Sequence, residues 1–324
     1  MLRKTSRNSR RKEAFVNAKA MIIKMDRIIR TITSDGSLMA SAIDSTTIVA
    51  TAQQLHGLSK TACAALGRLL TGASLMGAML KSDKASLTLK ANGGGPLGNL
   101  VAISDDRGNV RGYVDDPEVE LPLRANGKID VGGAVGVDGR LAVMRDFGER
   151  DPYIGQTELV SGEIAEDITR YYAQSEQVPT VCALGVLVNK ETGKSMLAGG
   201  LLIQVLPGAD DSAIAKLEEN VGRLESVTTM LAKGISLEDM CRMALDGFSM
   251  EILDEFQVHY ACPCSKERFA KALLTLGTEE ILSLPPNKEG VVEAICQYCG
   301  RKYYFTRNEL EELAETARGK AGKN

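Results

Sequence analysis

The sequence of 324 residues predicts an α+β protein: an N-terminal domain of mixed sheet and helix, a helical linker and a small C-terminal four-cysteine domain. Three observations predict this class. Apolar segments with a period of two, separated by polar turns, fill much of the first two hundred residues and are typical of strands. After Pro207-Gly208 the apolar spacing changes to three and four, which indicates helices. Four of the seven cysteines lie in the last quarter, in two tight pairs.

Composition and charge restrict the class of protein. The chain is 44% hydrophobic and 25% charged, which is ordinary for a globular protein. No apolar run approaches the roughly 18 residues that cross a bilayer, so we expect no membrane partner. Residues 1–24 hold eight Lys/Arg and one acid, leaving 31 of the 39 basic and 41 of the 42 acidic residues for the rest of the chain. That acidic body argues against nucleic acid as a partner, because phosphate contacts need basic patches.

The basic segment 1–24 has three interpretations. It is most simply a disordered leader or the product of an upstream start, since a clean strand pattern begins after Met25. A natural basic arm and a transit peptide are the alternatives, the latter because Arg and Ser are frequent and acids scarce. The segment lacks the apolar stretch of a secretory signal. We therefore expect a cytoplasmic protein, whose cysteines are normally reduced.

Residues 25–208 read as one α+β domain. It opens with two strands joined by a turn at Asp35-Gly36 and continues with a helix over 58–80 capped by Ser59. A meander of short strands starts at Ser86. A second helix, with Ser161 as its N-cap, ends before Pro179, and two apolar strands, "TVCALGVLVN" and "MLAGGLLIQVLP", close the domain.

Residues 212–256 are predicted to be helices only. Ile214, Leu217, Val221, Leu224 and Leu231 make an apolar stripe at helical spacing, and Ser236 with Asp239 resembles a capping box. This region also holds four of the twelve methionines: Met230, Met240, Met243 and Met250. Methionine-rich faces adapt to varied partners, so these helices are either ordinary docking helices or a promiscuous binding surface.

The final segment, 258–324, carries the candidate site. Cys262 and Cys264 flank one proline, and in an extended segment residues i and i+2 point to the same side. Cys296 and Cys299 form the CxxC knuckle that zinc ribbons use, after a gap of 31 residues. Four thiolates in a tetrahedron select Zn²⁺, so we expect one zinc ion per chain held by all four cysteines.

The remaining candidates are weaker. We expect Cys63, Cys182 and Cys241 to pack on apolar faces. His259 is either a donor to the metal ligands or an ordinary surface histidine. The glycines in "GGGPLG" match GxGxxG, but a strand pattern follows where a dinucleotide site needs a helix.

The zinc is either purely structural, folding a small tail domain, or part of a redox trigger that the paired spacing would allow. Within each pair, modest chain movement would bring the sulfurs together, and oxidation would consume the thiolates that hold the metal. Zinc binding contributes about 10–16 kcal/mol in finger peptides, whereas whole domains are stable by only about 5–15 kcal/mol. Loss of zinc should therefore unfold the tail and release the adjacent linker helices.

Several segments together resemble the heat-shock protein 33 family of redox-regulated chaperones. They are "CPCSKERF" and "CQYCGRKYYF" in the tail and "GGGPLG", "VRGYVDDP", "GQTELVSGEIAEDITRYYAQSEQVPT" and "AGGLLIQVLPGA" in the body, and the match runs from about Met25 to about Asn308. The resemblance implies an ATP-independent holdase rather than an enzyme, and it implies that residues 209–257 form a metastable helical linker. It implies zinc in the reduced form, disulfides Cys262–Cys264 and Cys296–Cys299 under oxidative stress, a homodimer when oxidised, and unfolded or oxidatively damaged client proteins as partners.

Two other functions stay open on the residues alone. A CxxC motif is also found in thiol–disulfide oxidoreductases, which place it at a helix N-terminus. A zinc ribbon with Arg301, Lys302 and neighbouring aromatic residues is also compatible with nucleic-acid binding.

Overall fold

The computed structural model describes residues 25–148 and 151–321, so the expected leader 1–24 lies outside the described residues. Two five-stranded antiparallel sheets form the body. The first has the order β10 (Met250–Gln257), β1 (Arg27–Thr33), β2 (Leu38–Asp44), β9 (Ser195–Val205) and β8 (Thr180–Val188). The second has the order β5 (Val110–Val114), β4 (Leu100–Asp105), β3 (Ser86–Gly94), β6 (Gly136–Asp146) and β7 (Tyr153–Glu158).

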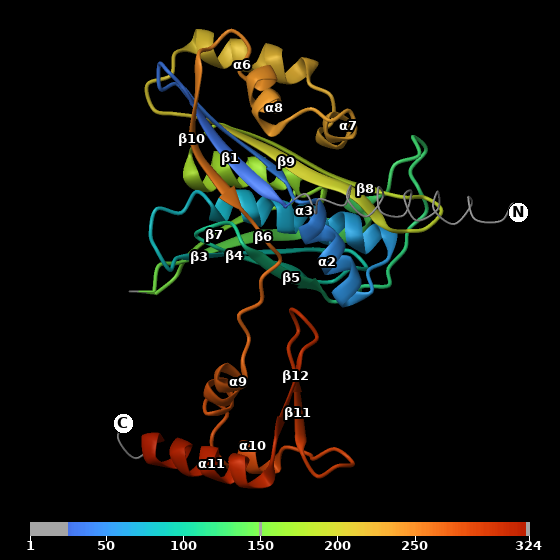
Figure 1. Cartoon of the computed structure of the whole chain (residues 1–324), viewed down its shortest axis with the longest axis vertical. Helices are drawn as coiled ribbons and strands as arrows, with labels where there is room; N and C mark the ends of the chain where they lie inside the picture. Colours follow the sequence, from blue (N-terminus) through green and yellow to red (C-terminus); the bar gives the residue numbers. More distant parts are fainter. Residues whose placement is uncertain (1–24, 149–150, 322–324) are drawn as a thin grey trace, which may run out of the picture.

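Helix α3 (Lys60–Gly77) fills the space between the two sheets (Figure 1). Ser59 caps it, as expected, by accepting a hydrogen bond from the Ala62 N–H. Every α3 residue except Lys60 and Arg68 is buried, and most are small. A Cβ on Gly77 would lie 2.1 Å from the Ser104 Oγ, which shows how closely the second sheet approaches the helix. The shorter helices α2 (Thr46–His56), α4 (Val131–Val135) and α5 (Ala165–Tyr171, continued by the π-helical turn Tyr172–Glu176) complete this layer.

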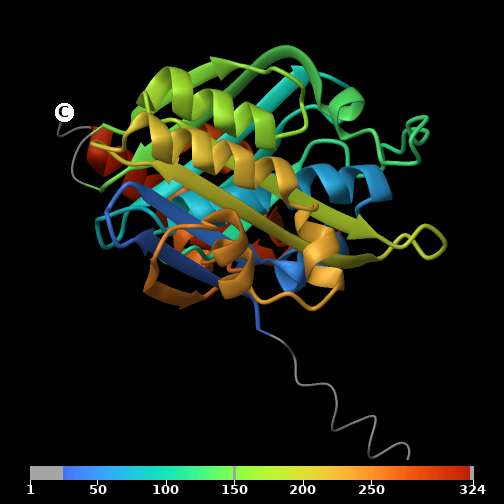
Figure 2. The same ribbon diagram turned by 90° about the horizontal axis from the view of Figure 1, so that it is seen from above.

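The first sheet is covered on both faces. Alternate residues of its strands point to opposite sides, so Ile28 and Ile43 join the core around α3, whereas Ile29 and Ala42 join a second core on the outer face. That outer face is covered by α6 (Asp211–Arg223), α7 (Val227–Ala232) and α8 (Leu237–Ala244), as Figures 1 and 2 show. The linker helices therefore hide apolar sheet surface.

The linker is not helical throughout, and this prediction was wrong for residues 250–257. They form β10, which pairs antiparallel with β1 from Arg27↔Gln257 to Thr33↔Met250. Most β10 side chains are exposed, so the strand is held by its backbone ladder and by ion pairs of Arg27 with Glu255 and Arg30 with Asp254. Residues 250–257 therefore form a strand because they pair with the otherwise open edge of β1.

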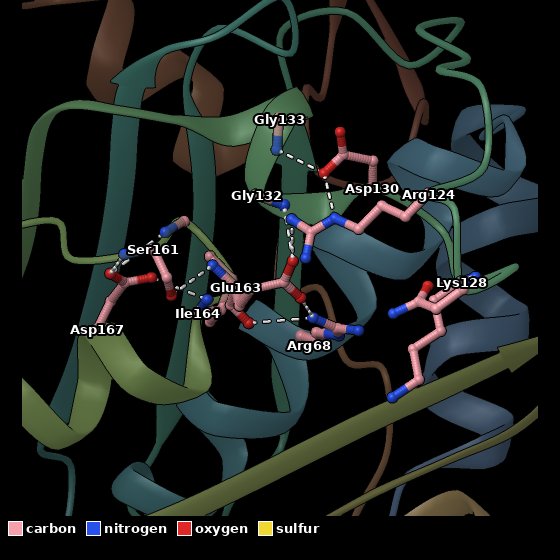
Figure 3. A network of polar contacts seen from close by, with 12 residues as sticks. Arg68, Arg124, Lys128, Asp130, Gly132, Gly133, Ser161, Glu163, Ile164 and Asp167 are labelled. Carbon is pink, nitrogen blue, oxygen red and sulfur yellow. Dashed lines mark hydrogen bonds and ion pairs between the residues drawn. The ribbon is translucent and has the colours of Figure 1, made fainter.

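The cap predicted for the helix after residue 160 was also wrong. The helix begins at Ala165, and the buried Asp167 carboxylate accepts hydrogen bonds from the N–H groups of Val160 (2.7 Å) and Ile164 (2.8 Å). The neighbouring Glu163 carboxylate is clamped between Arg68 and Arg124 (Figure 3).

The tail forms a separate lobe at the end of β10 (Figure 1). It contains α9 (Lys266–Leu273), α10 (Thr278–Ser283), the hairpin β11 (Val292–Ile295) and β12 (Lys302–Phe305), and α11 (Arg307–Ala321). Its own buried core is small: Ile281, Val292, Phe305, Leu310, Ala314 and Ala317. Domains of roughly 60 residues are marginally stable on core burial alone, so this lobe needs a further source of stability.

Candidate metal centre

Two arms of the tail bring the four predicted ligands together. Cys262 and Cys264 lie in the extended segment between Tyr260 and α9. Tyr260 itself forms an isolated β-bridge with Val110 of the body. Cys296 and Cys299 lie in the turn of the β11–β12 hairpin. There the Cys296 carbonyl accepts hydrogen bonds from the N–H groups of Cys299 (3.3 Å) and Gly300 (2.8 Å). Gly300 has φ +68°, a conformation that favours glycine, so the knuckle geometry depends on it.

The sulfur positions fit a tetrahedral zinc ion. All four Sγ atoms lie within 4.8 Å of one another, with Cys262 to Cys296 at 3.6 Å and Cys264 to Cys299 at 3.4 Å. Zinc–sulfur bonds of about 2.3 Å in a tetrahedron place sulfurs about 3.8 Å apart. Among the described residues, this is the one group of three or more Cys, His, Asp or Glu side chains positioned to share a metal. The predicted ligand set is thus assembled in space.

The four thiols have different environments. Cys296 is buried and the other three are half-buried. Burial raises the pKa of Cys262 and of Cys299. Burial also opposes ionisation of Cys264, but hydrogen bonds from Tyr303 and from the neighbouring thiols outweigh it and lower the pKa of Cys264 to about 7. Cys264 therefore ionises more readily than Cys262 or Cys299.

Tyr303 is a functional residue that the sequence did not reveal. Its hydroxyl lies 3.2 Å from the Cys264 Sγ and 2.9 Å from the Cys264 carbonyl oxygen. Such a donor orients a ligand and tunes its basicity. One signal was available in the sequence: Tyr303 lies four residues after Cys299, in the strand that follows the knuckle. The structure adds that this strand brings its hydroxyl to the other cysteine pair. His259, considered for this role, has an exposed side chain, and only its backbone forms hydrogen bonds with the body.

The other cysteines pack as predicted. Cys63 and Cys241 are buried and Cys182 is half-buried, and burial raises the pKa of each thiol to about 12. They are poor metal ligands and poor nucleophiles, because the thiolate is the reactive form.

Tyr298, inside the knuckle, connects the centre to the body. Its ring packs edge-on against Tyr113 with centroids 5.3 Å apart, and the Arg111 guanidinium lies 5.3 Å from its centroid. Its carbonyl oxygen accepts a hydrogen bond from His56 Nε2 at 3.1 Å. Burial lowers the pKa of His56, which keeps that ring neutral at neutral pH. The conformation of the CxxC turn therefore positions Tyr298 for these contacts between the tail and the body.

Comparison with known proteins identifies the family. The model of the Hsp33 protein family matches residues 26–306. The chain belongs to the Hsp33 family. Curated relatives named 33 kDa chaperonin are similar over nearly their whole length. The protein from Acetivibrio thermocellus is 45% identical over 90% of this chain and 97% of its own, and that from Clostridioides difficile is 44% identical over 89% and 98%.

The Hsp33 fold is shared with a solved structure. The crystal structure of the 33 kDa chaperonin (heat shock protein 33 homologue) from Thermotoga maritima superposes with a TM-score of 0.81 at 34% identity, covering 91% of this chain and 99% of that one. The α+β prediction and the Hsp33 resemblance are confirmed. Within residues 25–148 and 151–321, no helix combines the length and the apolar character that a bilayer crossing requires.

Proposed function

We propose that this Hsp33 protein is a redox-regulated, ATP-independent holdase of the cytoplasm. The observation that carries the proposal is the cluster of four thiols within 4.8 Å in a lobe whose own core is small. In the reduced form, one Zn²⁺ held by Cys262, Cys264, Cys296 and Cys299 supplies the stability that this core lacks. The relatives named chaperonin support the client-binding role.

The switch is an oxidation of thiolates. A Cys thiolate attacks peroxide and becomes a sulfenic acid, which condenses with a second thiol to a disulfide and water. Two such reactions give Cys262–Cys264 and Cys296–Cys299, consume two peroxide molecules and remove all four ligands. The close sulfurs support disulfide formation, because every pair of the four Sγ atoms is separated by no more than 4.8 Å.

Release of the linker would expose the client-binding surface. The linker helices bury Leu217, Met230, Leu231 and Met240 against the first sheet. β10 joins these helices to the tail and is itself mostly exposed. An unfolded tail would therefore remove the C-terminal anchor of β10, and the helices would leave the sheet. Both surfaces so exposed are apolar, which suits unfolding clients and a homodimer of the oxidised protein.

The test compares two states of the full chain. Zinc release is measured with a chromogenic chelator, and suppression of the aggregation of a heat-unfolded client by light scattering, before and after peroxide with mild heat. We expect one zinc released per chain and holdase activity only after oxidation. A Cys182→Ser variant is the matched control and should behave as the wild type. Equal holdase activity in the reduced, zinc-loaded form would contradict the proposal.

The disulfides have their own test. Peptide mapping by mass spectrometry should find Cys262 joined to Cys264 and Cys296 joined to Cys299 in the activated protein. A predominant Cys262–Cys296 bond would contradict the proposed pairing.

The oxidoreductase alternative is weakened by the position of the CxxC motif, because Cys296 and Cys299 lie in a hairpin turn and not at a helix N-terminus.

A further inference from the structure

A cavity in the body lies away from the cysteine cluster, at the β8 edge of the first sheet and next to the start of α7. It has a volume of about 570 Å³, within the range of small-molecule sites. Four parts of the chain enclose it: α3, the segment 120–129, the outer end of β8, and the start of α7. Its apolar lining includes Ala64, Leu121, Ile129, Leu184 and Val186.

The cavity carries an excess of positive charge. Lys60, Arg68, Lys128 and Lys190 line it, against one carboxylate, Glu120. Glu120 pairs with Lys60 at 3.5 Å, and Arg68 pairs with Glu163. Among the described residues, neither Lys128 nor Lys190 forms an ion pair. Two positive charges therefore remain without a partner.

The two lysines belong to neighbouring parts of the wall. The Lys190 ammonium lies 3.9 Å from the position that a Cβ on Gly127 would occupy, so it rests against the turn that carries Lys128. Figure 3 shows Lys128 beside the cluster of Arg68, Glu163 and Arg124, in which the carboxylate is already shared by two guanidinium groups. That carboxylate therefore does not neutralise the lysines.

We propose that the cavity binds an anionic amphiphile, a carboxylate with an unbranched apolar chain. The chain would lie on the apolar lining, where Leu184 and Val186 are only half-buried, and the carboxylate would meet Lys128 and Lys190. The combination selects against other ligands. A neutral apolar molecule leaves the ammonium groups unpaired, and a cationic amphiphile is repelled by them.

Binding is measured by calorimetry on the reduced, zinc-loaded full chain, in which the linker helices still cover the sheet. Decanoate, below its micellar concentration, should bind once per chain, and octanoate should bind about fifteenfold more weakly because each of the two missing methylenes contributes about fourfold. Decyltrimethylammonium should not bind. A protein that binds the cation as well as the carboxylate would overturn the proposal.

Charge reversal locates the head group. The double variant Lys128→Glu and Lys190→Glu should weaken decanoate binding by about tenfold or more. Lys90→Glu, an exposed lysine of β3, is the matched control and should change it less than about twofold. Equal losses in both variants would contradict the assignment.

Covalent labelling makes the test independent of variants. A decanoate carrying a terminal diazirine should label peptides that contain residues 120–129 and 184–190. Labels concentrated on α6–α8 or on the tail would overturn the proposal. Because this experiment uses the reduced protein and no client, its failure leaves the redox switch untouched, and failure of the switch leaves the cavity untouched.

Occupancy should also affect the linker, a consequence that rests on the proposed function. Ser226 and Thr228, at the start of α7, line the cavity together with α3 and β8. A ligand in contact with both layers stabilises the docked form by mass action. Saturating decanoate should therefore slow the peroxide-driven appearance of holdase activity in the wild type but not in the Lys128→Glu, Lys190→Glu variant. An unchanged rate despite binding would contradict this link.

Discussion

The chemistry of the metal centre depends on differences between its four thiols. Burial raises the pKa of Cys262 and Cys299, whereas hydrogen bonds to the Cys264 sulfur overcome its burial and lower its pKa to about 7. Zinc takes thiolates only, so it must displace the protons of the first two throughout the neutral range. Once the metal has left, Cys264 should react with peroxide before Cys262 and Cys299 do.

Zinc affinity should therefore fall steeply as the pH falls. Release of at least the Cys262 and Cys299 protons makes the apparent dissociation constant rise by about a hundredfold or more for each unit of pH lost. Below about pH 7 the slope should steepen, because Cys264 is then protonated as well. Competition with a chromogenic chelator between pH 6 and 8 measures the slope. A slope of fewer than two protons would contradict the thiol environments described above.

Removal of the Tyr303 hydroxyl should weaken the site without unfolding the tail. Tyr303→Phe keeps the ring packed on Phe269, whose centroid is 5.0 Å away, but loses the donor to the Cys264 sulfur. We expect zinc affinity to fall by about tenfold, as for other donors to metal ligands. Tyr304→Phe on the same strand, with 44% of the side chain exposed, is the control. Equal affinities of the two variants would exclude a role for the hydroxyl.

At the scale of elements, close packing on glycine positions holds the linker on the first sheet. A Cβ on Gly185 of β8 would lie 2.8 Å from the Thr228 Cγ2 of α7, and one on Gly199 of β9 would lie 2.8 Å from Leu231 Cδ1. Larger side chains at positions 185 and 199 would therefore keep α7 from packing on the sheet. The position of α7 thus depends on the sheet as much as on the metal centre.

Gly185→Val should consequently release α7 while zinc stays bound. The added methyl groups overlap Thr228, so the reduced, zinc-loaded variant should show part of the holdase activity that the wild type gains only on oxidation. Gly222→Ala in α6 is the control, because no heavy atom outside its helix backbone lies within 4 Å of the added Cβ. Zinc content and aggregation suppression are measured on the same samples. An inactive, zinc-loaded Gly185→Val protein would contradict release of α7 as an activating step.

The elements also show how much of the fold and of the site can be predicted from the sequence. The paired spacing of the cysteines predicted the metal ligands because i, i+2 and CxxC geometry is local. β10 was missed because "MEILDEFQ" has no strong strand pattern, and the edge that makes it a strand is β1, more than two hundred residues earlier. The covering of the sheet by the helices was likewise invisible, because apolar stripes say that a face is buried but not against what.

At the scale of the molecule, the knuckle residue Tyr298 couples the metal centre to the body. Arg111 stacks on its ring and also borders, with Pro263 and Tyr298, a cleft of about 210 Å³ beside the cysteines. The two lobes are also joined by the strand β10, by the bridge at Tyr260, and by the contacts of Tyr298 with His56 and Tyr113. Nothing in the sequence marked Arg111 or Tyr113 as partners of Tyr298.

Arg111→Ala should make the switch more sensitive. It removes a cation–π contact of about 0.5–2 kcal/mol without touching a ligand, so the tail should undock more often and peroxide should release zinc a few-fold faster. Arg107→Ala, an exposed arginine nearby, is the control. The absorbance of a zinc-sensitive dye measures the rate of zinc release from each of the two variants. Identical rates would show that docking through Tyr298 does not protect the centre.

Hydrogen exchange read by mass spectrometry, before and after peroxide with mild heat, tests the central claim most directly. The account predicts that α6–α8, β10 and the tail lose protection when zinc leaves, whereas α3 and the second sheet keep theirs. Full zinc loss with unchanged protection across residues 211–321 would contradict it.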